Sequence, residues 1–209
     1  ASGAVTVSLG VAGAQNSVGA GTDTLISIEN LTGSNFNDHL TGDSGANRLD
    51  GGAGADSLIG ASGDDVYLIN TTLDSITENA GEGTDRVIAS DNYTLTSWLE
   101  NLDFVDGSGW NGTGNELANI INGNSSNNVL SGLAGNDALN GGFGNDTLIG
   151  GMGNDAMDGG AGFDTVDYSQ EGGTRAVNVN LGESRTFESD LDPDGIAIPL
   201  DPHTAHDTF

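Results

Sequence analysis

A nine-residue period constrains this chain more than any other feature of its sequence. Residues 132–167 form four consecutive units, each with glycine at the first and fourth positions, usually glycine at the second, and an apolar residue at the eighth. The sixth position is acidic in all four units, and these acids are Asp137, Asp146, Asp155 and Asp164. A run rich in glycine and aspartate is usually only a loop. Strict recurrence instead predicts a stacked repeat, in which each unit buries its apolar residue against its neighbours.

The same template recurs in weaker form elsewhere in the chain. Residues 33–76 form a first array, and residues 114–131 continue the template with asparagine at the acidic position. Two isolated matches lie at residues 18–26 and 80–88. Outside the regular units, the acidic position is filled by Asp23, Asp38, Asn47, Asp56, Asp65, Asp74, Asp85, Asn119 and Asn128.

We expect five segments along the chain. Residues 176–182 resemble residues 4–10, so we expect a longer repeat to start again in the last segment. This similarity suggests that the chain is one segment of a longer protein. The expected segments are leading strands and a coil at 1–32, a first array at 33–76, wider connecting β coils at 77–113, a second array at 114–168, and a further repeat with an acidic, flexible insert at 169–209.

The charge of the chain excludes several classes of partner. The chain has 31 acidic residues and only four arginines, which gives a formal net charge of -27. A chain with so much like charge and so few apolar residues resembles disordered sequences unless cations neutralise it. The same charge repels nucleic acid and anionic membranes, so we expect neither as a partner. No stretch approaches the ~20 apolar residues that a membrane-spanning helix needs.

The spacing of glycine and aspartate predicts calcium sites. Glycine accepts the positive φ angles of a tight turn, so its carbonyl groups can face a cation. Aspartate adds a charged oxygen, and Ca²⁺ takes about six to eight oxygen ligands. One loop cannot supply them all, but two units make an 18-residue coil, so loops 18 residues apart stack with an ion between them. The expected pairs are Asp137 with the 150–155 loop, Asp146 with the 159–164 loop, and positions 38 with 56, 47 with 65 and 56 with 74.

These sites should differ in strength, because only loops that keep both glycine and aspartate should bind well. The regular units are expected to be strongest and the asparagine-bearing coils weaker, so Asp146→Ala and Asp155→Ala should raise the calcium midpoint more than Asn128→Ala. The candidate metal ligands are Asp23, Asp38, Asp56, Asp65, Asp85, Asp137, Asp146, Asp155 and Asp164, with Gly52, Gly54, Gly142, Gly144, Gly151, Gly153, Gly160 and Gly162.

The four units at 132–167 resemble the RTX repeats, the calcium-binding arrays of proteins exported by type I secretion. The resemblance implies an all-β fold, a right-handed parallel β-helix (β-roll) with two nine-residue units per coil and several calcium ions between turns. It also implies a secreted or cell-surface-associated protein whose parent engages the type I secretion apparatus. Such a module would be unfolded in low calcium and would fold after export.

Other roles for the same parent protein remain open. The chain could be a ligand- or surface-binding region, such as an adhesin or a carbohydrate-binding module, or an accessory domain of a secreted enzyme. Binding a polyanion would need a basic face, which four arginines do not provide, and the third position of the units shows no threonine ladder. No Ser/His/Asp or paired-acid constellation stands apart from the repeats. We therefore expect no catalytic residues, no enzyme activity and no organic cofactor.

Overall fold

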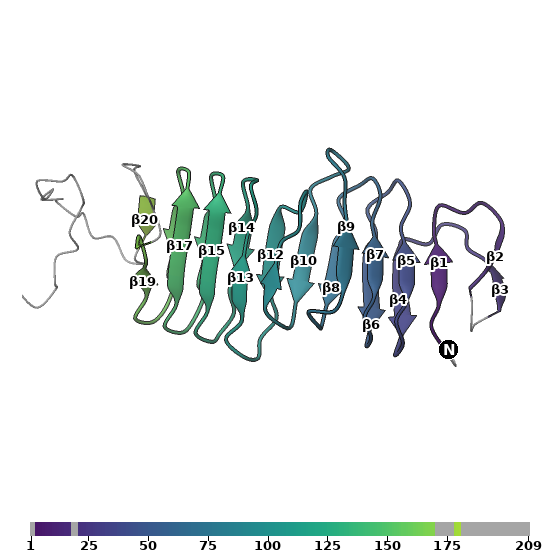
Figure 1. Cartoon of the computed structure of the whole chain (residues 1–209), viewed down its shortest axis with the longest axis horizontal. Helices are drawn as coiled ribbons and strands as arrows, with labels where there is room; N and C mark the ends of the chain where they lie inside the picture. The colour runs from purple at the N-terminus through teal and green to yellow at the C-terminus, as the bar shows by residue number, and fades with distance from the viewer. Residues whose placement is uncertain (1–2, 18–20, 170–177, 181–209) are drawn as a thin grey trace, which may run out of the picture.

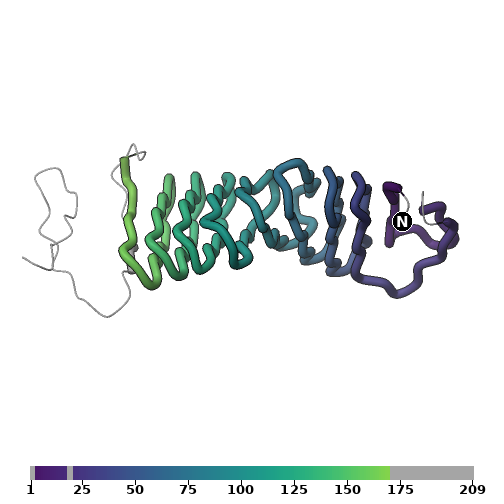
Figure 2. Tube along the Cα trace, turned by 90° about the horizontal axis from the view of Figure 1, so that it is seen from below, coloured from purple at the N-terminus to yellow at the C-terminus, as the bar shows by residue number. Residues whose placement is uncertain are grey.

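The computed structural model describes residues 3–17, 21–169 and 178–180, which form an elongated stack of short strands. Colour changes steadily along the long axis in Figure 1, so each coil lies beside the one before it in sequence, and Figure 2 shows the same progression at 90°. Nothing in this part of the chain forms a helix of the length and apolarity that a membrane crossing needs. The fold is an all-β solenoid, as the repeat predicts.

One face of the solenoid is a continuous nine-stranded sheet. All of its neighbouring strands pair in parallel. Its strands are β4 (Asn30–Ser34), β6 (Arg48–Gly52), β8 (Val66–Ile69), β10 (Arg86–Ala89), β12 (Asn101–Phe104), β14 (Ile120–Asn122), β16 (Ala138–Asn140), β18 (Ala156–Asp158) and β20 (Asn178–Asn180).

The opposite face is divided into two parallel sheets, with no strand pairing between β9 and β11. The first is β1 (Thr6–Ser8), β5 (His39–Thr41), β7 (Ser57–Ile59) and β9 (Ser75–Thr77). The second is β11 (Tyr93–Thr94), β13 (Asn111–Thr113), β15 (Val129–Ala134), β17 (Thr147–Met152) and β19 (Thr165–Val166).

The core is a narrow ladder of apolar side chains between the two faces. Leu130 aligns with Leu148 on one face and Leu139 with Met157 on the other, each pair one 18-residue coil apart. These four side chains are at most 2% exposed. Alternate residues of a strand point to opposite faces, so one apolar residue per unit faces inward. Burying each contributes about 1.5–3 kcal/mol, which is little against the backbone entropy of nine residues, at about 1–2 kcal/mol each.

The connecting segment at 77–113 consists of coils of unequal length. Val66 pairs with Arg86, twenty residues on, then Arg86 with Asn101, fifteen on, and Asn101 with Ile120, nineteen on. Two of these coils are longer than the 18-residue repeat, and one is shorter. Leu99 and Leu102 are fully buried here, so the core of the first array continues into the second.

The N-terminal segment combines one coil strand with a hairpin. β1 pairs in parallel with β5 and so closes the first array. β2 (Ala14–Asn16) and β3 (Thr22–Thr24) pair antiparallel, with Gln15 opposite Asp23. The isolated template match at 18–26 therefore does not form a stacked coil at residues 21–26. Asp23 lies in the β2–β3 hairpin instead.

At the C-terminal end, β20 pairs with β18 and adds a last strand to the nine-stranded sheet. This strand lies within the segment expected to restart the longer repeat. The acidic insert predicted beyond it lies outside the described residues.

Candidate metal centre

The repeat loops lie in two rows, one along each edge of the solenoid. Row A contains the loops that lead into the nine-stranded sheet, and row B contains those that lead into the opposite face. Within each row, the loops of successive coils stack directly on one another, because the strands that follow them are in register. Row A comprises the loops at 42–47, 60–65, 78–85, 95–100, 114–119, 132–137 and 150–155. Row B comprises those at 33–38, 51–56, 70–74, 105–110, 123–128, 141–146 and 159–164.

One oxygen of each aspartate in the stack is fixed by the preceding coil. The backbone N–H of Asp137 donates to Asp155 Oδ1 at 3.0 Å, and that of Asp146 donates to Asp164 Oδ1 at 3.0 Å. The first array repeats this bond, with Asp38 N–H donating to Asp56 Oδ1 at 2.8 Å. These bonds join the loop pairs predicted from the 18-residue spacing.

The second oxygen of these carboxylates is buried and has no hydrogen-bond partner. This holds for Oδ2 of Asp56, Asp65, Asp137, Asp146 and Asp155, whose residues are 1–2% exposed. A buried carboxylate oxygen without a partner is costly, because it has lost its water and gained nothing in exchange. A recurring arrangement of this kind along both rows points to a cation that the oxygens would share.

The first glycine of each unit leaves a space lined by oxygen atoms. A Cβ at Gly132 would lie closer than 3.0 Å to Asp137 Oδ2 and to the carbonyl oxygen of Gly150, one coil further on. A Cβ at Gly141 would meet Asp146 Oδ2 and the Gly159 carbonyl in the same way. Carboxylate and carbonyl oxygens are the donors that Ca²⁺ prefers. The residues present therefore fit calcium, with one ligand set drawn from two successive coils.

The remaining candidate glycines serve the shape of the loops. All eight adopt positive φ, from 81° at Gly160 to 155° at Gly153. This is the conformation that glycine accepts without strain and other residues resist. Their lack of a side chain lets each loop approach the backbone of the previous coil closely.

Burial changes the acidity of the carboxylates in these rows. Desolvation raises the pKa of Asp137 to about 6, and it raises the pKa of Asp56 and Asp146 as well. Backbone N–H bonds to these carboxylates act in the opposite direction but do not cancel the effect. Without a metal, these groups resist ionisation in the folded state.

The structure brings most of the predicted ligands together and leaves one apart. Asp38, Asp56, Asp137, Asp146 and Asp155 lie buried in the two rows, with Asp65 and Asp85 at the junction of the first array and the connecting coils. Asp164 is half-buried in the last described loop of row B. Asp23 is exposed in the β2–β3 hairpin, where its Oδ2 accepts a bond from the Ser17 hydroxyl at 2.8 Å. Asp23 therefore does not lie among the stacked carboxylates, where the template predicted it.

The asparagine-bearing loops are built differently from the aspartate loops. Asn119 Nδ2 donates to the carbonyl oxygens of Leu99 and Glu100, at 3.1 and 3.2 Å, and Asn128 Nδ2 donates to that of Trp110 at 2.9 Å. Asn115 and Asn124 make similar bonds to carbonyl groups of the preceding coil. Side-chain amide N–H groups thus donate hydrogen bonds to the carbonyl oxygens between these coils. A side-chain amide can replace an ion here, because it supplies the missing donor.

Two acidic residues that the template did not single out also belong to row A. Glu78 is 7% exposed, and its Oε2 has no partner. Glu100 accepts the backbone N–H of Asp85 at 2.8 Å through Oε2, so it takes the place of an aspartate in the stack. Glu78 lies eighteen residues after Gly60, and this spacing was the available signal in the sequence.

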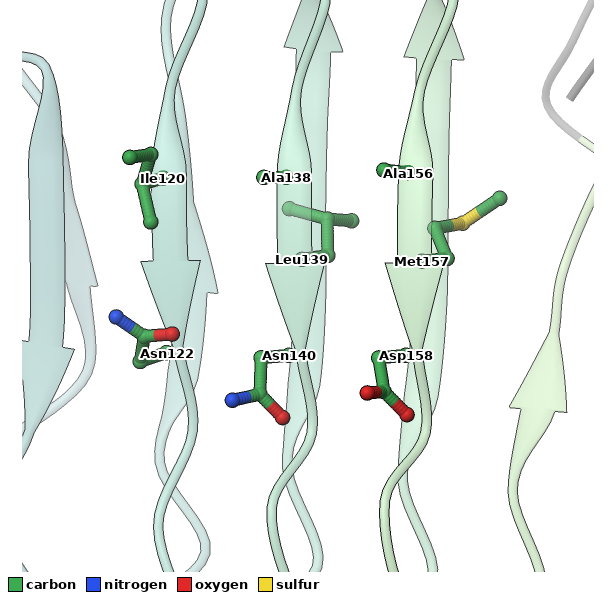
Figure 3. Close-up of a pocket in the computed structure, with 8 residues that line it drawn as sticks. All are labelled: Ile120, Asn122, Ala138, Leu139, Asn140, Ala156, Met157 and Asp158. Atoms are coloured by element: carbon green, nitrogen blue, oxygen red, sulfur yellow. The ribbon is translucent and has the colours of Figure 1, made fainter. Parts of the chain in front are cut away.

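The outer surface of the nine-stranded sheet carries a shallow hollow. Figure 3 shows Ala138 and Ala156 in one row and Asn122, Asn140 and Asp158 in a second row across three strands. The hollow occupies about 350 Å³ and lies on the opposite side of the strands from the core. Its lining offers the amide groups of Asn122 and Asn140, the carboxylate of Asp158 and apolar side chains.

Comparison with protein-family models matches the chain to the RTX calcium-binding nonapeptide repeat (4 copies) at residues 32–67, 113–148 and 134–166. A search of curated proteins found no significant match. The matched residues cover most of both arrays, including loops in which carboxylate and carbonyl oxygens face each other. The arrays of this chain belong to the RTX calcium-binding nonapeptide repeat family.

Proposed function

We propose that this chain is a calcium-responsive module of a secreted protein, unfolded at low calcium and folded when Ca²⁺ fills the spaces between its coils. One observation carries the proposal: successive aspartates have one oxygen bonded to the neighbouring coil and the other buried without a partner. The folded chain therefore lacks positive charge at regularly spaced positions. Both the family and the donor set support Ca²⁺ as the ion that supplies it.

The energetics support folding that depends on the ion. The chain carries a net charge of -27, and its core is one apolar residue per nine. An ion that binds only the folded state stabilises it by RT ln(1 + [Ca²⁺]/Kd) at each site. Each Ca²⁺ also removes repulsion between neighbouring carboxylates. Calcium sites of extracellular modules have Kd values of ~10⁻⁴–10⁻³ M, which would leave such a module unfolded in the cytosol.

The biological role follows from this response. An unfolded chain suits passage through a type I secretion apparatus, and the higher calcium outside the cell would then drive folding. We place the chain outside the cell or at its surface and assign it a structural role without catalysis. The alternative, recognition of an extracellular ligand, has the amide-lined hollow of Figure 3 as its best candidate surface.

Circular dichroism of metal-free protein at neutral pH tests the proposal. Adding Ca²⁺ should produce a β-sheet signal, and removing it with a chelator should reverse the change. Mg²⁺ should be much less effective, because it requires a tighter octahedral shell and gives up water reluctantly. Identical spectra with calcium and with chelator would show that the fold does not depend on the ion, and the proposal would fail.

Substitution of the regular aspartates tests the assignment of ligands. Asp146→Asn and Asp155→Asn should each raise the calcium midpoint several-fold, because each replaces a charged ligand with a neutral amide. Glu116→Gln is the matched control, since it removes the same charge from an exposed side chain in an asparagine-bearing loop. Calcium titrations followed by circular dichroism should leave this control close to the unmodified protein. Equal shifts in all three variants would mean that net charge alone sets the midpoint.

A further inference from the structure

Glu78 occupies a position that is glycine in the regular units. It is the first residue of the 78–85 loop, eighteen residues after Gly60, and this loop is two residues longer than the six-residue loops around it. A glutamate fits here only because its side chain turns back toward the preceding coil. A Cβ at Gly60 would lie closer than 3.0 Å to Glu78 Oε1, Asp65 Oδ2 and the Tyr67 hydroxyl oxygen. Oxygens of three side chains therefore converge on the space that Gly60 leaves open.

Asp85 completes the group from the other end of the same loop. One carboxylate oxygen from each of Asp65, Glu78 and Asp85 lies within 4.8 Å of the other two, and all three residues are buried. Oδ1 of Asp85 accepts the backbone N–H of Asp65 at 2.9 Å, which fixes Asp85 against the preceding coil. The Tyr67 hydroxyl donates to Glu78 Oε1 and fixes that side chain from within the core.

No basic side chain compensates these carboxylates among the described residues. The ion pairs of this region join Arg48 to Asp50 and Arg86 to Asp103. Meanwhile Oδ2 of Asp65 and Oε2 of Glu78 have no hydrogen-bond partner, in residues that are 1% and 7% exposed. Buried charges of one sign persist in proteins only when they are paired or bind a metal.

We infer that Asp65, Glu78 and Asp85 form a distinct cation site with three carboxylates, the tightest of the row. The inference rests on the proposed function, since it takes the same ion, but it concerns a ligand that the nonapeptide template does not contain. At a regular position such as Gly132, one carboxylate oxygen and one backbone carbonyl oxygen of the next coil converge, whereas here three carboxylates lie together. Calcium affinity rises with the number of charged ligands. The site therefore fills first, and its charge of three favours a trivalent lanthanide over Ca²⁺.

Terbium luminescence gives a direct test, because an aromatic ring close to a bound Tb³⁺ transfers its excitation to the ion. Tyr67 contacts Glu78, so it should sensitise an ion at this site. Titration of the metal-free chain with Tb³⁺ should give an early emission phase. Glu78→Gln should shift that phase about tenfold to higher Tb³⁺, whereas Glu116→Gln should not. Glutamine can still accept the Tyr67 hydrogen bond, so the coil should fold at saturating calcium.

Tyr67→Phe provides a second and independent measurement. It should remove most of the early emission, because the phenol ring that transfers its excitation to the bound ion is lost. Unchanged early emission in either Tyr67→Phe or Glu78→Gln would overturn the three-carboxylate site. If the unmodified protein shows no calcium-dependent folding at all, the proposed function fails. If it folds with calcium and Glu78→Gln behaves like Glu116→Gln, only this inference fails.

Discussion

Gly153→Ala is expected to prevent stable folding of the second array even at saturating calcium. Gly153 has a φ of 155°, and a Cβ there would overlap the carbonyl oxygen of Gly135 in the preceding coil. Both groups belong to backbone that is held by the stacked loops, so no side chain can rotate to relieve the overlap. Overpacking a fixed site costs about 1–3 kcal/mol or more, and here the loops would have to separate.

Urea denaturation in excess calcium, followed by circular dichroism, measures this effect. Gly10→Ala is the matched control, because the nearest backbone atom to its added Cβ is the Gly42 carbonyl oxygen at 3.7 Å, an ordinary contact. The control should unfold close to the unmodified protein, whereas Gly153→Ala should lose most of the signal of the second array. Equal midpoints for the two variants would mean that the loops do not stack as closely as the structure shows.

Acidification is expected to restore part of the fold when calcium is absent. Burial raises the pKa of Asp65 and Asp85 to about 6 and that of Glu78 to about 7, and the same cause raises the pKa of Asp137 to about 6. The unfolded values are 3.8 for aspartate and 4.5 for glutamate. Between the two sets of values, the folded state binds more protons than the unfolded state. The free energy of unfolding of the metal-free chain therefore falls as pH rises from about 4 to about 7.

Several groups face this cluster and shape the pH dependence. Asp43, Asp64, Glu82 and Glu100 add negative charge around it and strengthen the upward shifts. Calcium should reverse the trend, because protons then compete with the ion for the same oxygens.

The measurement is circular dichroism of dialysed, metal-free protein across that pH range, beside a calcium-saturated sample. The metal-free sample should gain β signal on acidification while the calcium affinity of the other sample declines. A metal-free chain that loses structure as the pH falls from 7 would contradict the raised pKa values.

Much of this architecture could be predicted from the period alone, because every coil repeats the same environment. The burial of Leu139 or Leu148, and the stacking of Asp137 on Asp155, follow from an 18-residue coil. Asp23 shows where such reasoning stops. One match to the template is not enough, since a loop needs a partner one coil away, and the residue eighteen positions after Asp23 is Thr41.

Other features depended on contacts that no single unit contains. Glu78 does not fit the template, and only the three-dimensional approach of Gly60, Asp65 and Tyr67 shows where its side chain lies. The asparagine loops could be recognised from Asn119 and Asn128, but the carbonyl groups that their amides reach lie in irregular coils. Those coils have lengths of 20, 15 and 19 residues, which a fixed period cannot anticipate.

The asparagine bonds between coils also bear on the order in which the rod assembles. In a solenoid each coil touches only its neighbours, so structure spreads from any coil that is already formed. Coils whose carbonyl groups already accept amide N–H bonds should depend less on an ion, and they lie directly before the four regular units. They can act as a template on whose exposed edge the next coil docks. We expect the second array to fold in order from residue 131 toward residue 167. Each bound ion would order a loop that then contributes ligands to the next ion.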